Sequence, residues 1–177
     1  PYRQVFSSLE MPGCKWFEGS LTNYAEHILR FESRAGNATV ALHHSTETRS
    51  LTGMTWSELG TNVRIVAEQL RTLGLRPGDR VVSYMPNVPE TVIAMLATTA
   101  IGAVWSSAAP EFGSKTVIER FGQIAPSLIF AADGYTFGGK IFDRRGEVTQ
   151  IVKGLPSLRA VVYLPYLGLR RPNVAIQ

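Results

Sequence analysis

The chain has 177 residues, of which 45% are hydrophobic and 18% charged, a composition that favours a packed core and excludes a disordered tail or a coiled coil. Its 18 basic and 14 acidic residues leave a net charge of +4 without a basic cluster, so no nucleic-acid partner is expected. No apolar stretch approaches the ~20 residues of a membrane span, and no secretory signal is present, so we expect a cytoplasmic protein without a membrane partner. Cys14 is the single cysteine, which excludes an internal disulfide framework.

The first 37 residues differ in pattern from the rest. An aromatic loop, Trp16-Phe17-Glu18-Gly19, precedes a short helix that Asn23 can cap, with Glu26 three residues further on to close a capping box. We therefore predict two regions: residues 1–37 as an N-terminal cap segment, and residues 38–177 as an incomplete α/β domain that continues in further polypeptide.

From residue 38 onwards, predicted strands alternate with predicted helices. Strands are expected at 40–42, 80–85, 103–106, 127–132 and 158–164, and helices at 55–73, 87–102, 114–124 and 143–152. The helix at 55–73 opens with a capping box formed by Thr55 and Glu58. Alternation of this kind implies right-handed crossovers, and the short continuous apolar strands imply helices on both faces. The predicted fold class is therefore α/β, with a mostly parallel open sheet.

In open parallel sheets, ligands bind beyond the carboxyl ends of the strands. That rule selects four loops in this chain, at 86–87, 107–113, 133–140 and 165–166. In the second loop, small residues at 106–109 would let a ligand come close, and ordinary tight packing is the alternative.

The third loop contains the sharpest local motif. Residues 134–140 fit the pattern G-x-x-x-x-G-K between a predicted strand and a predicted helix, which is the context of a phosphate-binding loop. Ile141 stands where that motif needs a hydroxyl to hold Mg²⁺, which argues against a nucleoside triphosphatase. The glycines still let backbone N–H groups approach an anion, and Lys140 adds a positive charge. A glycine-rich turn with a solvated lysine is the alternative. We find no catalytic dyad and no metal-ligand set.

Several segments resemble the adenylate-forming acyl-CoA synthetases. They lie at 16–19, 21–27, 54–59, 76–81, 85–90, 133–140 and 153–156. The segment 101–107, followed by Pro110-Glu111-Phe112-Gly113, is similar to the acetoacetyl-CoA synthetases in particular, because acetyl-type enzymes usually carry a histidine where Trp105 stands.

The resemblance implies the N-terminal part of the large domain of an adenylate-forming enzyme. Such a ligase activates acetoacetate with ATP and Mg²⁺ to an acyl-adenylate, releasing pyrophosphate, and CoA then displaces AMP to give acetoacetyl-CoA. The residues that handle ATP would lie beyond Gln177, so this chain alone is expected to be inactive and to hold no tightly bound cofactor. A synthetase for another short acid, or a non-catalytic nucleotide-binding or interaction domain, is the alternative.

The resemblance also implies a CoA-binding role for two loops. The residues it selects are Glu111, Phe112, Phe137, Gly139 and Lys140. Acetyl-type relatives carry arginines where Phe137 and Lys140 stand, so Lys140 is expected to contact the 3′-phosphate, whereas Phe137 can only stack or pack. Expected partners are the small-molecule substrates acetoacetate, ATP and CoA and the remainder of the same polypeptide. Unpaired strand edges also favour self-association.

Overall fold

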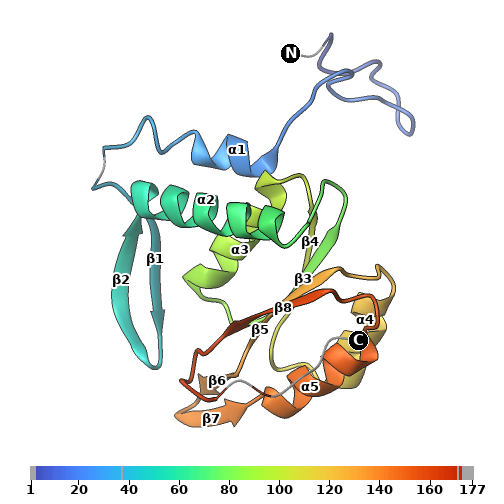
Figure 1. Cartoon of the computed structure of the whole chain (residues 1–177). Coiled ribbons are helices and arrows are strands. Elements are labelled where there is room, and N and C mark those ends of the chain that lie inside the picture. The colour runs from blue at the N-terminus through green and yellow to red at the C-terminus, as the bar shows by residue number, and fades with distance from the viewer. Residues whose placement is uncertain (1–2, 37, 171, 173–177) are drawn as a thin grey trace.

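A computed structural model describes residues 3–36, 38–170 and 172. Its centre is a four-stranded parallel sheet in the order β4-β3-β5-β8 (Figure 1). The strands are β3 (Arg80–Tyr84), β4 (Val104–Ala108), β5 (Leu128–Ala132) and β8 (Ala160–Leu164). All three pairings are parallel, which confirms the predicted α/β class.

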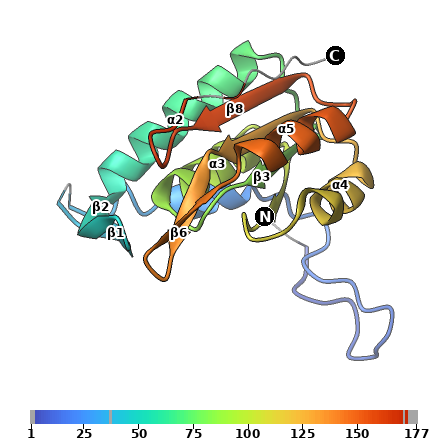
Figure 2. The ribbon, with the colours of Figure 1, turned by 90° about the horizontal axis from the view of Figure 1, so that it is seen from below.

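Helices cover both faces of this sheet, as predicted. One face carries α2 (Trp56–Thr72) and α3 (Pro89–Ala100), and the other carries α4 (Ser114–Gly122) and α5 (Arg145–Gly154) (Figure 2). Successive strand residues therefore enter different cores: Val81 packs in the cluster of α2 and α3, and the next residue, Val82, in that of α4 and α5. Within the described part of the chain, no helix is both long and apolar enough to cross a membrane.

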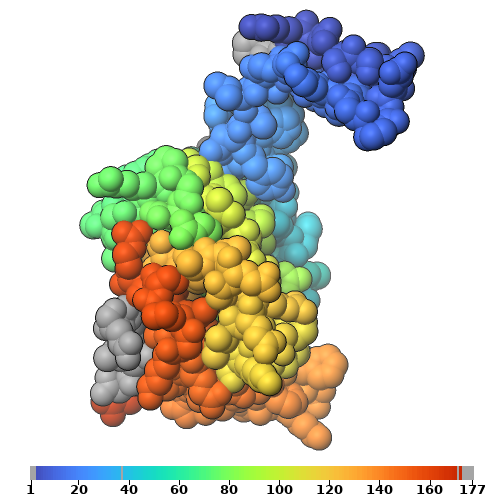
Figure 3. Space-filling view, turned by 90° about the vertical axis from the view of Figure 1, so that its right-hand side faces the viewer, coloured from blue at the N-terminus to red at the C-terminus, as the bar shows by residue number. Residues whose placement is uncertain are grey.

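The short helix α1 (Tyr24–Leu29) lies against α3. The Asn23 side chain accepts a hydrogen bond from the Glu26 backbone N–H at 3.1 Å, which confirms Asn23 as the cap but not the return bond by which Glu26 was expected to close a capping box. The Asn23 amide group also donates to the Thr99 carbonyl oxygen at 2.8 Å, which fixes α1 to the end of α3. The described residues that precede α1, from residue 3 onwards, form an arm that stands apart from the rest of the molecule (blue in Figure 3). The division at residue 37 stays a prediction.

A first hairpin extends the predicted strand at 40–42. It consists of β1 (Val40–Thr46) and the antiparallel β2 (Arg49–Thr55). β2 could not be predicted from the sequence, because most of its side chains are exposed and it lacks the apolar alternation of a half-buried strand.

A second hairpin corrects the interpretation of the glycine-rich loop. Residues 134–143 form β6 (Gly134–Phe137) and β7 (Lys140–Asp143), which pair antiparallel. A helix does follow the motif, as predicted, but an unpredicted strand lies between them, because Lys140 begins β7 and α5 begins only at Arg145. The glycines therefore belong to a β-turn, and the N-terminus of α5 does not follow them directly.

The capping box of α2 is present as predicted. The Thr55 hydroxyl accepts from the Glu58 N–H at 3.2 Å, and the Glu58 carboxylate accepts from the Thr55 N–H at 2.8 Å. The same backbone hydrogen bond from Thr55 lowers the pKa of Glu58 below its ordinary value.

Replacing this cap should weaken the fold measurably. We expect Thr55→Ala to lower the free energy of unfolding by about 1 kcal/mol, because the Glu58 N–H loses its acceptor and the Glu58 carboxylate loses the hydroxyl that donates to it. Urea denaturation followed by circular dichroism measures the change. Thr61→Ala is the matched control, since Thr61 is exposed within the same helix. Equal stabilities of the two variants would contradict this role of Thr55.

Candidate functional site

A cavity of about 460 Å³ lies beyond the carboxyl ends of β3 and β4. All four loops selected from the sequence contribute to its lining, and so does the turn between β1 and β2. Its lining includes Thr46, Glu47, Pro86, Asn87, the residues 107–111, the residues 135–137 and Tyr166. The parallel sheet thus brings together segments that are up to 120 positions apart, from Thr46 to Tyr166.

Tyr84, the last residue of β3, holds the loop that contains the cavity-lining residue Pro110. Its side chain is fully buried, and its hydroxyl lies 2.8 Å from the carbonyl oxygens of both Pro110 and Phe112, to which it donates. Burial raises the pKa of Tyr84 to about 12, which keeps the hydroxyl protonated as a donor. The sequence analysis missed this residue, although a tyrosine at the carboxyl end of a buried strand was the available signal.

The turn between β6 and β7 presents two backbone N–H groups. Gly138 and Gly139 have φ values of 59° and 71°, in the left-handed region required at both central positions of a type I′ turn. Their N–H groups donate to the two carboxylate oxygens of Glu47, at 2.7 and 2.9 Å. Gly-Gly between Tyr-Thr-Phe and Lys-Ile-Phe was the sequence signal for this hairpin. Nothing in the sequence pointed to Glu47 as its partner.

The structure brings four of the five predicted site residues into one region. Glu111 and Phe137 line the cavity, and 71% of the Phe137 side chain is exposed. Gly139 and Lys140 follow Phe137 in the same hairpin. Lys140 is exposed and forms no ion pair with any carboxylate of the described residues. Binding of CoA by these residues stays a prediction.

Phe112, the fifth predicted residue, is not among the cavity-lining residues. The Arg120 guanidinium lies over its ring, 4.8 Å from the centroid. Its backbone carbonyl oxygen accepts from the Tyr84 hydroxyl. Phe112 therefore contributes to the shape of the loop through its backbone, while its ring packs with α4.

Side chains of the first hairpin hold the opposite wall. The Arg49 guanidinium lies 4.9 Å from the ring centroid of Tyr166 and is paired with the Glu90 carboxylate at 2.7 Å. The hydroxyls of Thr48 and Tyr166 are 3.3 Å apart. These contacts dock the β1–β2 turn beside the second hairpin, which places Glu47 at the Gly-Gly turn.

The chemistry available here is that of binding. The charged residues that line the cavity are two acids, Glu47 and Glu111, and the cation Lys140 lies nearby as the first residue of β7. Among the residues that the structure describes, no group of three or more His, Cys, Asp or Glu side chains could hold a metal ion. We assign no catalytic residue to this site.

Comparisons with known proteins agree with this architecture. Residues 32–167 match the family model described as AMP-binding enzyme. Acetoacetyl-CoA synthetase of Macaca fascicularis is 43% identical over 157 residues, which cover 88% of this chain and 23% of the relative. Acetoacetyl-coenzyme A synthetase of Rhizobium meliloti is 39% identical over 158 residues, which cover 89% of this chain and 23% of the relative.

A solved structure shows the same fold. Acetoacetyl-CoA synthetase from Streptomyces lividans superposes with a TM-score of 0.91 and 46% sequence identity, covering 98% of this chain and 27% of that one. This chain thus spans about a quarter of the length of the relatives it matches. Because the family model matches most of the sequence, the chain belongs to the AMP-binding enzyme family.

Proposed function

We propose that this chain forms the CoA-binding part of an ATP-dependent enzyme that joins acetoacetate to CoA. The observation that carries the proposal is the turn at Gly138 and Gly139, where two N–H groups bind an oxyanion next to Lys140 and beside a strand-end cavity. The similarity to acetoacetyl-CoA synthetases over nearly the whole chain supports acetoacetate as the acid. The proposed setting is the cytoplasm.

The proposed reaction has two steps. A carboxylate oxygen of acetoacetate attacks the α-phosphorus of ATP, and the bond to pyrophosphate breaks, which gives the acyl-adenylate. The CoA thiol then attacks the acyl carbon, loses its proton, and displaces AMP. We place the groups that bind ATP, Mg²⁺ and acetoacetate outside this chain, so we expect the 177-residue chain alone to form no AMP from these substrates. AMP formation by the isolated chain would contradict that assignment.

The proposed pose follows from the shape and charge of the site. Lys140 and the turn amides would bind the 3′-phosphate of CoA, since all of them are donors to an anion. The exposed ring of Phe137 offers a face on which adenine can stack. The pantetheine arm, which carries no charge, would then enter the cavity past Glu111.

Loss of the lysine charge tests this pose. We expect Lys140→Ala to weaken CoA binding about 5- to 30-fold, because an exposed charge-assisted contact contributes about 1–2 kcal/mol. Dephospho-CoA, which lacks the 3′-phosphate, should bind the variant and the parent chain equally. Isothermal titration calorimetry measures both affinities.

The matched control is Lys153→Ala. Lys153 is an exposed lysine in the last turn of α5 and does not line the cavity. The substitution Lys153→Ala removes one positive charge, as Lys140→Ala does, and should leave the CoA affinity unchanged. Equal weakening by both variants, or equal affinity of the parent chain for CoA and dephospho-CoA, would contradict the proposed site.

A further inference from the structure

The carboxylate of Glu47 occupies the anion-binding turn. Its two oxygens accept from the N–H groups of Gly138 and Gly139, at 2.7 and 2.9 Å, across 91 and 92 positions of sequence. A carboxylate held by two adjacent N–H donors shows what the turn binds: a pair of oxygens that carry negative charge. The turn thus binds an oxyanion, and in this structure the oxyanion is the carboxylate of Glu47.

A phosphate group presents paired oxygens at a similar spacing and carries more charge than a carboxylate. It cannot occupy the two N–H groups while Glu47 holds them. Lys140, the next residue, has no ion-pair partner among the described carboxylates, so the charged half of the site is open while the amide half is filled. A Cβ built at either glycine would meet no atom within 4 Å, so there is space around the turn for a ligand.

Glu47 is not the only group that docks the first hairpin. The pair formed by Arg49 and Glu90, together with the contacts of Arg49 and Thr48 to Tyr166, already joins that hairpin to the body of the domain. Glu47 is itself exposed, so its carboxylate would enter water at little desolvation cost when it leaves the turn. The bond to the turn can therefore break without loss of the hairpin.

We propose that Glu47 is an internal competitor at the anion site. In the ligand-free protein, its carboxylate accepts from the Gly138 and Gly139 N–H groups. It leaves them when the 3′-phosphate of CoA binds there. It thereby lowers the affinity for phosphate-bearing CoA without touching the reacting atoms. This inference rests on the proposed function, because it assigns a regulating residue to the same site.

The test compares CoA with dephospho-CoA on the 177-residue chain. Titrations followed by ¹H–¹⁵N NMR give the dissociation constants, and the amide signals of Gly138 and Gly139 report on the turn directly. We expect Glu47→Gln to bind CoA about 3- to 10-fold more tightly, since one like charge and one competitor are removed. The affinity for dephospho-CoA should not change. Glu119→Gln, an exposed acid of α4, is the matched control and should bind like the parent chain.

A second variant keeps the negative charge. Glu47→Asp has the same carboxylate on a side chain one methylene shorter, so its oxygens no longer reach the two N–H groups, and it should also bind CoA more tightly than the parent chain. This variant carries the test if Glu47→Gln does not fold. CoA binding that is unchanged or weaker in both variants, while Lys140→Ala still weakens it, overturns the competitor and leaves the proposed function standing. If the Lys140 and Glu47 variants all bind CoA as the parent chain does, both proposals are wrong.

Discussion

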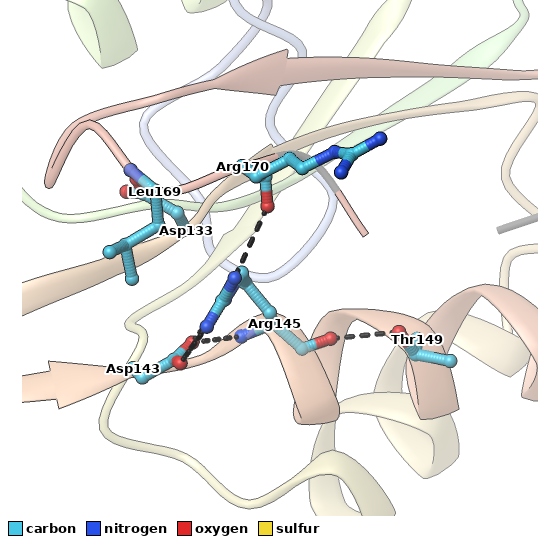
Figure 4. A network of polar contacts seen from close by, with 6 residues as sticks. All are labelled: Asp133, Asp143, Arg145, Thr149, Leu169 and Arg170. Carbon is cyan, nitrogen blue, oxygen red and sulfur yellow. Dashed lines mark hydrogen bonds and ion pairs between the residues drawn. The ribbon is translucent and has the colours of Figure 1, made fainter. Parts of the chain in front are cut away.

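Asp133→Asn is expected to lower the free energy of unfolding by about 2–3 kcal/mol. Asp133 follows β5 and is fully buried. Its two carboxylate oxygens accept from the backbone N–H groups of Leu167 and Leu169, at 2.8 and 2.9 Å, and Figure 4 shows Asp133 beside Leu169. Hydrogen bonds to a charged group contribute about 1.5–3 kcal/mol. Asparagine has the same shape but places an NH₂ group against one of these donors.

The segment that Asp133 holds directly follows a residue of the cavity wall. Leu167 follows Tyr166, which lines the cavity, so the variant should loosen that wall as well as the fold. Urea denaturation at pH 7 measures the stability. Hydrogen exchange at the amides of Leu167 and Leu169 measures the local effect, which should be faster exchange at both.

Asp143→Asn is the matched control for this prediction. Asp143 is exposed and paired with Arg145 at 2.7 Å, and its carboxylate also accepts from the Arg145 backbone N–H (Figure 4). Exposed ion pairs contribute about 0–1 kcal/mol, so this variant should be clearly the more stable of the two. Similar losses in the two variants would show that burial of Asp133 does not determine its contribution.

The central sheet could be predicted because its two inner strands, β3 and β5, are largely buried. The sequences of β3 and β5 are short, mostly apolar runs between helical patterns. Such runs are typical of parallel strands that helices cover on both faces. The capping boxes fix helix starts from local chemistry alone, as the Thr55 cap shows. From the parallel sheet, the general rule on strand ends selected the four loops that line the cavity.

The hairpins and the partner of the turn could not be found in the same way. β2 lies mostly in solvent, so burial imposes no alternation on its sequence. Gly139 and Lys140 were interpreted through a phosphate-loop pattern, although Gly-Gly between aromatic and β-branched residues is equally the pattern of a hairpin. The contact of Glu47 with this turn depends on how two distant hairpins meet, which no local pattern encodes.

Asp133 begins one of the four loops predicted to bind a ligand, but no role was predicted for its carboxylate. An acid after a buried strand is typical of a ligand site at the edge of a parallel sheet. Here its carboxylate is used entirely by backbone N–H groups of the segment after β8. A buried carboxylate that accepts from backbone is a structural group, and only the path of the chain after Leu164 decides between the two roles.

Tyr84→Phe is expected to lower the free energy of unfolding by about 1–3 kcal/mol at pH 8. The buried hydroxyl is the donor to the carbonyl oxygens of Pro110 and Phe112, and its loss leaves both of them without this partner. The loop that lines the cavity should therefore become more mobile, with faster hydrogen exchange around residue 112. Tyr24→Phe is the control, since Tyr24 is 56% exposed, and it should change stability little.

The contribution of Tyr84 should also depend on pH, in a direction that follows from its burial. Burial raises its pKa from about 10 to about 12, so folding favours the neutral phenol. Its contribution is complete below pH 10 and is lost as the pH rises through 12, by at most about 2.7 kcal/mol for a shift of two pKa units. Phenylalanine has no proton to lose. The stability gap between the parent chain and Tyr84→Phe should therefore close as urea titrations move from pH 8 to pH 11.5. A gap that stays constant over that range would mean that the folded chain does not hold this hydroxyl protonated more strongly than the unfolded chain does.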